Sequence, residues 1–304
     1  MANVYSIADA GAAGALAGSS CAFGVFDGLH LGHRFLIGET LRDSAERTCA
    51  LTFDIDPDEL FSPKRLRKLM TNESRIRALA SSGVDAVVVL PFSPGFAQLS
   101  PQAFLASTFE RAVPASMHVG SDVRFGKAAA GDVDALRIWG ESAGCRVEPH
   151  ALIVEDGAPV TATRIRALLE ASAVEEANRL LGRPYVLEGT VVEGRHEGRD
   201  MGFRTANLQM PAMLQAIGEG VYAAYAHVGG ARYKAAVSVG VAPTFAEEAT
   251  ATCEAHLLDF EGDIYGERIS LEFRHWLRAM RKFDSVDELI ATVMGNISWV
   301  REHL

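Results

Sequence analysis

The chain has 304 residues, 48% of them hydrophobic and 22% charged, which is enough for two ordinary domains with buried cores. A formal net charge of −10 argues against a nucleic-acid-binding protein, and no apolar run is long enough to cross a membrane. Four widely spaced cysteines without a C-x-x-C pair argue against a disulfide framework or a zinc site and are typical of reduced thiols in the cytoplasm. We therefore expect a cytoplasmic protein without nucleic-acid or membrane partners; a homo-oligomer is left open.

In the first half, short apolar runs alternate with amphipathic stretches as far as about Leu181. We expect strands over residues 21–26, 49–53, 86–90 and 116–119, and helices over 31–47, 73–82, 101–109 and 133–142. The first of these helices is predicted to place Leu31, Phe35, Leu36 and Leu41 on one side. Strands that are apolar on both faces and separated by helices predict an α/β domain whose parallel sheet is covered on both sides.

The sequence pattern of the second half differs, and the change begins after the turn-forming Gly182-Arg183-Pro184. Short β-rich runs occur over residues 185–192, 220–227, 233–239, 253–259 and 268–273, and they predict an antiparallel sheet or small barrel. Residues 285–304 are predicted to form a closing helix, with Ser285 as N-cap and Glu288 as its capping-box partner. We place the domain boundary between residues 182 and 183, which gives domains 1–182 and 183–304.

A first candidate site is the string G-V-F-D-G-L-H-L-G-H at residues 24–33, between the first strand and the first helix. Ligands of open α/β sheets bind at the carboxyl ends of strands, and the N–H groups at a helix start favour phosphate. Gly24, Gly28 and Gly32 allow close approach of backbone and phosphate. His30 and His33 are three residues apart, so both can face one side of the first helical turn.

Two imidazoles in this place suit adenylyl transfer, in which a phosphate attacks the α-phosphorus of ATP and pyrophosphate leaves. The nucleophile is already ionised, so the site has to supply positioning and charge stabilisation without a general base. By itself the histidine pair also fits a surface or capping feature. A metal site lacks its remaining ligands, and a hairpin at Asp27-Gly28 is disfavoured because a helical pattern follows.

A second candidate site is the glycine-rich string at residues 194–208, G-R-H-E-G-R-D-M-G-F-R-T-A-N-L. Turns that contain Arg195 and Arg199 can wrap phosphates, and Thr205 and Asn207 offer oxygens to a hard cation such as Mg²⁺. Taken alone, Thr205 and Asn207 would more simply cap a turn.

The chain resembles the prokaryotic bifunctional riboflavin kinase/FAD synthetase family in several motifs that occur in the same order. His30, Gly32 and His33 match the H-x-G-H of the nucleotidyltransferase superfamily. Three further motifs match in the first half. Thr52-Phe53-Asp54 matches the start of the family's T-F-D-P-H-P, and residues 119–126 with Gly131-Asp132 resemble its V-G-x-D-F-R-F-G…G-D. Residues 163–166 resemble the end of its S-S-T-R-I-R. In the second half, residues 202–207 match the family's G-F-P-T-A-N, with Arg204 in place of the proline. Residues 240–245 match part of its G-x-R-P-T-F, with Ala242 in place of the arginine. Residues 254–260 match its E-V-H-L-L-D-F, and Tyr265-Gly266 matches its Y-G.

The resemblance implies an N-terminal Rossmann-like FMN adenylyltransferase domain and a C-terminal antiparallel β-barrel riboflavin kinase domain with a closing helix. Such an enzyme phosphorylates riboflavin to FMN and adenylylates FMN to FAD, with ATP as co-substrate and Mg²⁺. The implied catalytic residues are His30 and His33 for adenylyl transfer and Glu254 as the base of the kinase, with Thr205 and Asn207 holding the metal. The implied nucleotide- and flavin-binding residues are Gly24, Phe26, Asp27, Gly28, Gly32, Asp122, Arg124, Thr163, Arg166, Gly198, Arg199 and Gly202.

The chain also departs from the family pattern at positions that would supply phosphate donors or cations. Asp56 stands where the family has histidine, Ala128-Ala129 where it has Gly-Arg, and Ala162 where it has serine. These departures leave open a riboflavin kinase with a weak or altered adenylyltransferase domain. A non-catalytic flavin or nucleotide sensor and a different adenylyl- or cytidylyltransferase also stay open as hypotheses. The residues that stack on the flavin ring are left unassigned among Phe245, Phe260, Tyr265, Trp276 and Phe283.

Overall fold

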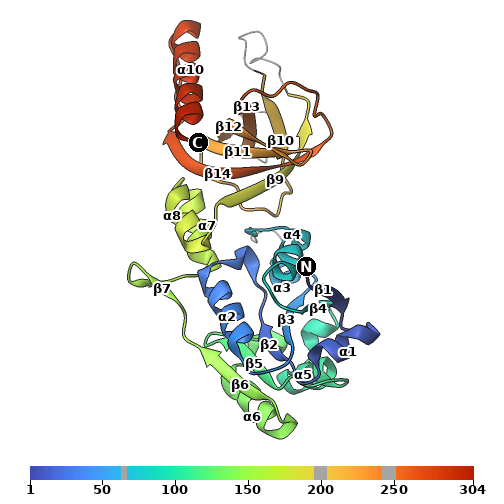
Figure 1. Ribbon diagram of the computed structural model, residues 1–304. Helices are drawn as coiled ribbons and strands as arrows, with labels where there is room; N and C mark the ends of the chain where they lie inside the picture. The colour runs from blue at the N-terminus through green and yellow to red at the C-terminus, as the bar shows by residue number, and fades with distance from the viewer. Residues whose placement is uncertain (63–66, 195–203, 242–250) are drawn as a thin grey trace. The chain divides into compact units, whose positions relative to one another are not determined.

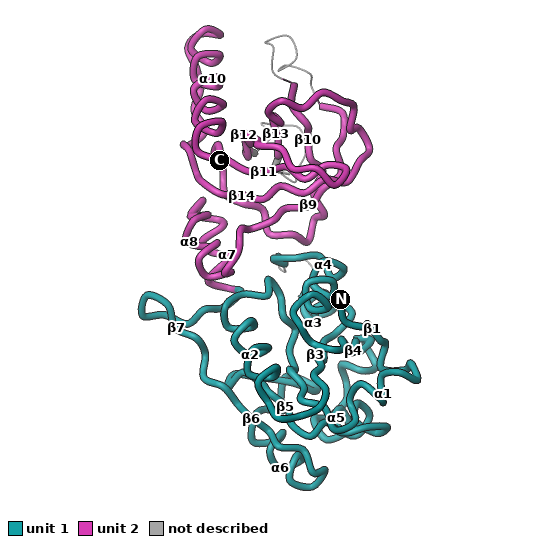
Figure 2. The backbone as a smooth tube through the Cα atoms, viewed as in Figure 1, with its two compact units in different colours: residues 1–162 teal, residues 163–304 magenta. Residues whose placement is uncertain are grey.

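The computed structural model describes residues 1–62, 67–194, 204–241 and 251–304 (Figure 1). The chain divides into two units, residues 1–162 and residues 163–304 (Figure 2).

The first unit is built on a six-stranded parallel sheet. Its strands are β1 (Asn3–Ser6), β2 (Ser20–Phe23), β3 (Thr48–Phe53), β4 (Ala86–Leu90), β5 (Ser116–Gly120) and β6 (Arg146–His150). The helices of this unit are α1 (Ala10–Leu16), α2 (Leu31–Arg42), α3 (Pro57–Phe61), α4 (Asn72–Ala80), α5 (Pro101–Phe109) and α6 (Val133–Ala143). A small hairpin, β7 (Val154–Glu155) with β8 (Ala158–Pro159), follows β6.

The strand order β1-β4-β3-β2-β5-β6 confirms the parallel sheet and gives it a switch point. From β2 the chain runs outward through β3 and β4, and it then crosses back to place β5 on the other side of β2. Helices lie on both faces of the sheet (Figure 1). In such sheets ligands bind outside the carboxyl ends of the strands where the order reverses, which here is between β2 and β5.

The burial pattern explains why this sheet forms. Successive residues of a strand point to opposite faces. Leu51 and Val88 join one buried cluster, and their neighbours Ala50 and Val87 join the cluster on the other face. Strands with two apolar faces are stable only between two layers of helices.

In the first unit, two predicted boundaries differ from the observed ones by three residues or more. The first strand ends at Phe23 instead of residue 26, because Phe26 takes a left-handed φ of 63°. The helix predicted to reach residue 47 ends at Arg42, and its buried side chains include Leu36 and Ile37, whereas Phe35 and Leu41 are exposed. It ends there because Asp43 turns into extended backbone and its carboxylate accepts hydrogen bonds from Ser116 and Arg146.

The second unit contains a closed antiparallel barrel, which confirms the barrel prediction. Its strands are β9 (Tyr185–Val192), β10 (Ala206–Gln209), β11 (Gly220–Val228), β12 (Ala231–Val241), β13 (Ala251–Leu257) and β14 (Arg268–Arg278), in the order β10-β13-β12-β11-β14-β9. The barrel closes because β9 also pairs with β10. Helices α7 (Ala162–Glu170) and α8 (Val174–Leu181) precede it, and α10 (Val286–His303) follows it.

The closing helix α10 begins as predicted, with one difference in its cap. The Ser285 hydroxyl accepts the N–H of Glu288 at 3.2 Å. The Glu288 carboxylate accepts the N–H of Asp284 at 3.3 Å, so the reciprocal bond of the predicted capping box reaches one residue further back. Near its end, Ile297 and Val300 pack against the barrel.

The two helices before the barrel pack against it. The Asn178 amide donates to the carbonyl of Phe273 at 2.9 Å, and its oxygen accepts the N–H of Tyr185 at 2.6 Å. Gly218 donates to the carbonyl of Leu169 at 2.7 Å. The unit division therefore falls about 20 residues before the predicted boundary at 182/183, and that boundary stays a prediction about where the domains can be separated.

Candidate active sites

The loop between β2 and α2 holds the histidines of the first site. Phe26 and Leu29 take left-handed φ values of 63° and 45°, and Gly28 takes 76°. Through these turns the chain leaves β2, passes a short 3-10 helix at Asp27–Leu29 and enters α2. The helix therefore starts at the carboxyl edge of the sheet, at the switch point.

The two imidazoles lie against each other as a pair. The rings of His30 and His33 are stacked, with centroids 3.7 Å apart and an interplanar angle of 19°. Burial lowers the pKa of His33 well below its usual value, and the charges of His30 and Arg75 lower it further. His33 is therefore a neutral imidazole at neutral pH, and a neutral imidazole donates one hydrogen bond. Gly32 is fitted to this pair, since a Cβ there would lie 3.2 Å from the His30 ring.

The start of α2 suits a phosphate. Its first turn, residues 31–34, is Leu-Gly-His-Arg and carries no acidic residue. The positive end of a 12-residue helix is thus not neutralised from within its own first turn. Backbone N–H groups at such a helix start bind anions.

Two residues of the first motif have supporting contacts inside the protein. Phe26 is fully buried and packs edge-on against His33, with 5.3 Å between ring centroids. The Asp27 carboxylate accepts the N–H of Leu69 with its two oxygens, at 2.9 and 3.1 Å. Both side chains hold the loop in place, and contact of either with a nucleotide stays a prediction.

The motif after β5 lies next to the histidine loop. β2 and β5 are neighbours, with Ala22 opposite His118, so their carboxyl ends come together. A Cβ on Gly120 would lie 2.8 Å from the Asp122 carboxylate, so the two residues lie close together. Asp122 and Arg124 are both exposed at this edge.

An aromatic cavity of about 500 Å³ lies at the same edge, and sequence reasoning missed it. Its rings come from segments far apart in the chain: Phe53, Phe61, Phe92, Phe96, Phe104 and Phe125. Arg124 and Lys127 also line it. A signal was present, because Phe53 ends β3 and Phe92 follows β4 by two residues.

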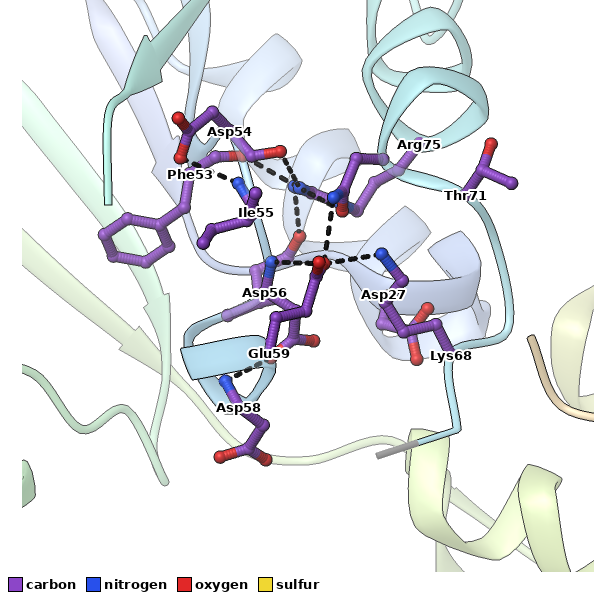
Figure 3. Close-up of polar contacts among 12 residues, drawn as sticks. Asp27, Phe53, Asp54, Ile55, Asp56, Asp58, Glu59, Lys68, Thr71 and Arg75 are labelled. Carbon is purple, nitrogen blue, oxygen red and sulfur yellow. Dashed lines mark hydrogen bonds and ion pairs between the residues drawn. The ribbon is translucent and has the colours of Figure 1, made fainter. Parts of the chain in front are cut away.

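The acid that replaces the family's histidine caps a helix. Asp56 accepts the N–H of Asp58 at 2.9 Å, and the Glu59 carboxylate accepts the N–H of Asp56 at 3.1 Å (Figure 3). Glu59 also pairs with Lys68 at 2.5 Å and accepts from the Asn72 amide at 2.8 Å. Asp56 thus fixes the start of α3, which lines the aromatic cavity.

The last residues assigned to ATP in the first half lie in α7. Arg166 donates to the Thr163 hydroxyl at 3.1 Å. Both belong to the second unit, so their contact with ATP stays a prediction.

The kinase residues meet on two neighbouring strands of the barrel. Asn207 on β10 lies directly opposite Glu254 on β13. Residues paired in this way have their side chains on the same face. The flanking Ala206 and Ala255 are buried in the barrel, whereas Asn207 and Glu254 are half-buried. The amide and the carboxylate therefore share the outer face of the barrel wall.

The backbone around Asn207 is closely fitted. A Cβ on Gly194 would lie 2.0 Å from the Asn207 amide nitrogen, so a larger residue there would displace the Asn207 side chain. Arg204 replaces the family's proline, and its carbonyl accepts a hydrogen bond from His256 Nδ1 at 2.8 Å. The Arg204 carbonyl therefore has a hydrogen-bond partner on β13.

A cavity of about 670 Å³ adjoins these strands. Thr205, Asn207 and His256 line it, together with the rings of Phe260 and Tyr265. Its oxygen-bearing residues suit a hard cation that also binds ATP phosphates. Within the ranges that the structure describes, no group of three His, Cys, Asp or Glu side chains forms a metal site. A bound Mg²⁺ would thus depend on the oxygens of Thr205 and Asn207 and on the nucleotide.

Part of the second motif lies outside the described residues, namely the predicted phosphate ligands Gly198, Arg199 and Gly202. Phe245, a candidate for stacking on the flavin, also lies outside them.

Among the helices that the structure describes, none is both long and apolar enough to cross a membrane.

Comparisons with known proteins match a different family model to each half of the chain. The FAD synthetase family model matches residues 13–164, and the riboflavin kinase family model matches residues 181–304. A protein from Listeria monocytogenes named bifunctional riboflavin kinase/FMN adenylyltransferase is 32% identical over 277 residues, covering 89% of this chain and 87% of its own. A protein of the same name from Pseudomonas fluorescens is 30% identical over 288 residues, covering 93% and 92%.

A solved structure shares the whole architecture. It is titled a macrolide-efflux protein from Streptococcus pneumoniae, and it superposes with a TM-score of 0.83 at 29% identity over 94% of this chain and 95% of its own. Its title names another activity than the curated relatives do, so we take only the fold from it.

Proposed function

Because this chain belongs to the bifunctional riboflavin kinase/FMN adenylyltransferase family and so converts riboflavin to FMN and FMN to FAD with ATP, we propose that each step has its own site, with the catalytic residues of the two steps in different units. The observation that carries this proposal is the separation of the two residue sets. His30 and His33 lie within residues 1–162, and Asn207 and Glu254 lie within residues 163–304.

Adenylyl transfer takes place at the start of α2. The FMN phosphate attacks the α-phosphorus of ATP, a P–O bond to FMN forms, and the bond to pyrophosphate breaks. No base is needed, so the protein has to hold the phosphates and stabilise the charge that moves to the leaving group. The helix start supplies N–H groups, and the stacked pair His30 and His33 supplies hydrogen-bond donors beside them.

The aromatic cavity beside this site takes the flavin ring of FMN. A flat apolar ring fits a pocket lined by phenylalanines, and about 500 Å³ is within the usual range for small-molecule sites. Arg124 and Lys127 give the cavity positive charge for the phosphate end. Asp122 beside them contacts either the nucleotide or the flavin phosphate region.

Riboflavin phosphorylation takes place on the outer face of β10 and β13. Glu254 accepts the proton of the terminal ribityl hydroxyl as that oxygen attacks the γ-phosphorus of ATP and ADP leaves. Thr205 and Asn207 hold the Mg²⁺ that accompanies ATP, and this ion neutralises phosphate charge when it is bound. The adjoining cavity of about 670 Å³ takes the substrates.

The phosphate contacts of Gly198, Arg199, Gly202, Thr163 and Arg166 remain part of this proposal on the strength of the sequence motifs. A cytoplasmic location fits the four cysteines, all of them free and buried.

One assay tests the proposal. The protein is incubated with riboflavin, ATP and Mg²⁺, and FMN and FAD are separated over time; we expect FMN first and FAD after it. A second reaction with FMN and ATP should give many turnovers of FAD. FMN formation without FAD would mean a riboflavin kinase alone, and binding without any product would mean a sensor.

A further inference from the structure

Arg75 on α4 has one of the largest buried side chains of the protein, and no function has yet been assigned to it (Figure 3). Only 2% of its surface is exposed. Arginine is rarely buried so completely, because removing a guanidinium from water is costly unless every donor is paired.

The guanidinium connects the ends of two strands. One terminal nitrogen donates to the carbonyl of Val25 at 2.9 Å and to the hydroxyl of Thr52 at 2.7 Å. The other donates to the carbonyls of Phe53 and Asp54 at 2.8 and 3.3 Å and to Asn72 Oδ1 at 3.3 Å. Val25 follows β2, and Phe53 and Asp54 end and follow β3.

These bonds lie beyond the ladder that joins β2 and β3. The last paired residues are Phe23 and Leu51, and one further bond runs from the Gly24 N–H to the Leu51 carbonyl. Past that point the ladder between the two strands ends, and the Val25 carbonyl accepts from the Thr52 hydroxyl at 3.2 Å as well as from Arg75. A guanidinium has five donors in a rigid fork, which an ammonium cannot reproduce.

The link to the histidines is short. Val25 precedes Phe26, whose ring packs on His33 and whose left-handed φ of 63° depends on its surroundings. Fixing the Val25 carbonyl therefore fixes the loop that carries His30 and His33.

The charge of Arg75 also reaches the histidine pair. The charged or titratable groups that act on His33 are His30 at the start of α2 and Arg75 on α4, and both lower its pKa. Burial lowers the pKa of Arg75 itself, whereas four carboxylates raise it: Asp56, Asp27, Glu59 and Asp54. The cation is thus retained inside the protein by acids from the histidine loop and from the segment that starts α3.

We propose that Arg75 is a positioning residue for adenylyl transfer: it ties the segment after β2 to the end of β3 and so holds the His30–His33 pair where the ATP phosphates bind. This role rests on the function proposed for that pair.

The test uses the full chain with Arg75→Met and Arg75→Lys, and Arg77→Met as the matched control. Arg77 is on the same helix, is exposed and pairs only at the surface with Glu73 among the contacts described, at 2.6 Å. FAD formation from FMN and FMN formation from riboflavin are measured in the same samples. For Arg75→Met we expect kcat for FAD to fall on the order of 10–100-fold, with smaller changes in KM and with kinase activity retained. Arg77→Met should match the wild type.

The pH profile separates charge from geometry. Arg75→Met removes a positive charge beside His33, so the pKa of His33 rises and the acid limb of FAD formation moves to higher pH. Arg75→Lys keeps the charge and loses the fork, so its rate falls while its acid limb stays near that of the wild type.

Two results would overturn the positioning role. One is a wild-type kcat and acid limb in Arg75→Met. The other is an equal loss of kinase and adenylyltransferase activity in both Arg75 variants, which would indicate a residue that only stabilises the fold. A wild-type chain that makes FMN but no FAD from FMN would instead refute the adenylyl-transfer function itself, a result visible before any variant is made.

Discussion

The proposed mechanism assigns different side chains to the two reactions. In the proposed mechanism, the stacked histidines donate hydrogen bonds at a helix start, where no proton has to be removed from the attacking phosphate. Glu254 lies opposite Asn207, where a hydroxyl has to lose its proton. The chemistry of each step thus agrees with the residue type at each site.

Replacing Glu254 should affect one reaction alone. Glu254→Gln keeps the size of the side chain and removes the base, so FMN formation should fall about 10²–10⁴-fold. FAD formation from added FMN should stay unchanged. The mirror experiment is His30→Ala with His33→Ala, in which FMN should accumulate and FAD should not form. If a folded Glu254→Gln protein lost both activities, the two-site assignment would be wrong.

The buried imidazole of His33 should make folding depend on pH. Its pKa is lowered in the folded state, so the unfolded chain binds the proton more readily. Protonation of His33 in the unfolded chain therefore lowers the free energy of unfolding. This effect is absent above the pKa of His33 in the unfolded chain, about 6.5, and it grows as the pH falls below that value, by up to about 1.4 kcal/mol per pH unit. In urea unfolding between about pH 7 and pH 5, His33→Gln should lose less stability than the wild type. The exposed His303→Gln should follow the wild type, and parallel curves for all three proteins would contradict the explanation.

Among the elements, the turn after β5 shows strain at Ala128 that the family's glycine would not carry. Ala128 and Ala129 have φ values of 54° and 55°, in the left-handed region that favours glycine. They line the aromatic cavity, where the family has Gly-Arg. The departure at this turn therefore replaces a glycine where the backbone needs one.

Restoring that glycine should stabilise the first unit. Ala128→Gly removes the strain of a left-handed alanine, which outweighs the added freedom of the unfolded chain, so unfolding should cost about 0.5–1 kcal/mol more. The matched control is Ala130→Gly, because Ala130 has an ordinary φ of −75° and should gain nothing. Equal effects of the two changes in chemical denaturation would rule out backbone strain as the cause.

At the scale of the whole molecule, the two helices before the barrel decide where the chain can be cut. α8 buries Val174, Ala177, Leu180 and Leu181 completely. Fully burying a Val or Leu side chain contributes about 1.5–3 kcal/mol, so together they approach the stability of a whole domain. These helices therefore belong with the barrel in any fragment that has to fold.

A fragment of residues 163–304 should fold and phosphorylate riboflavin, whereas a fragment of residues 183–304 should have a much lower melting temperature or not fold. Circular dichroism and the FMN assay measure both. Asn178→Ala in the longer fragment should be intermediate, because the Asn178 side chain bonds to Tyr185 and Phe273. Equal stability of the two fragments would support the boundary predicted from the sequence.

Much of the architecture was predictable because it depends on local pattern. Continuous apolar runs such as Ala86–Leu90 predicted buried strands, and the structure has that strand with the same ends. The spacing of His30 and His33 predicted a common face on one helical turn, and their rings are stacked. The edge strand β6 was missed because its sequence, R-V-E-P-H, mixes charges with a proline, which is typical of strands at the edge of a sheet.

By itself, the sequence determined the two classes of domain, because these follow from periodicity along a few consecutive residues. Its resemblance to the family's motifs gave their order and the residues expected for each reaction. Only the tertiary structure decided that six phenylalanines from separate segments enclose one cavity. It also decided that Arg75 bonds to Val25, 50 residues away. Such groupings depend on which strand ends become neighbours in the folded sheet, and local sequence pattern does not encode that adjacency.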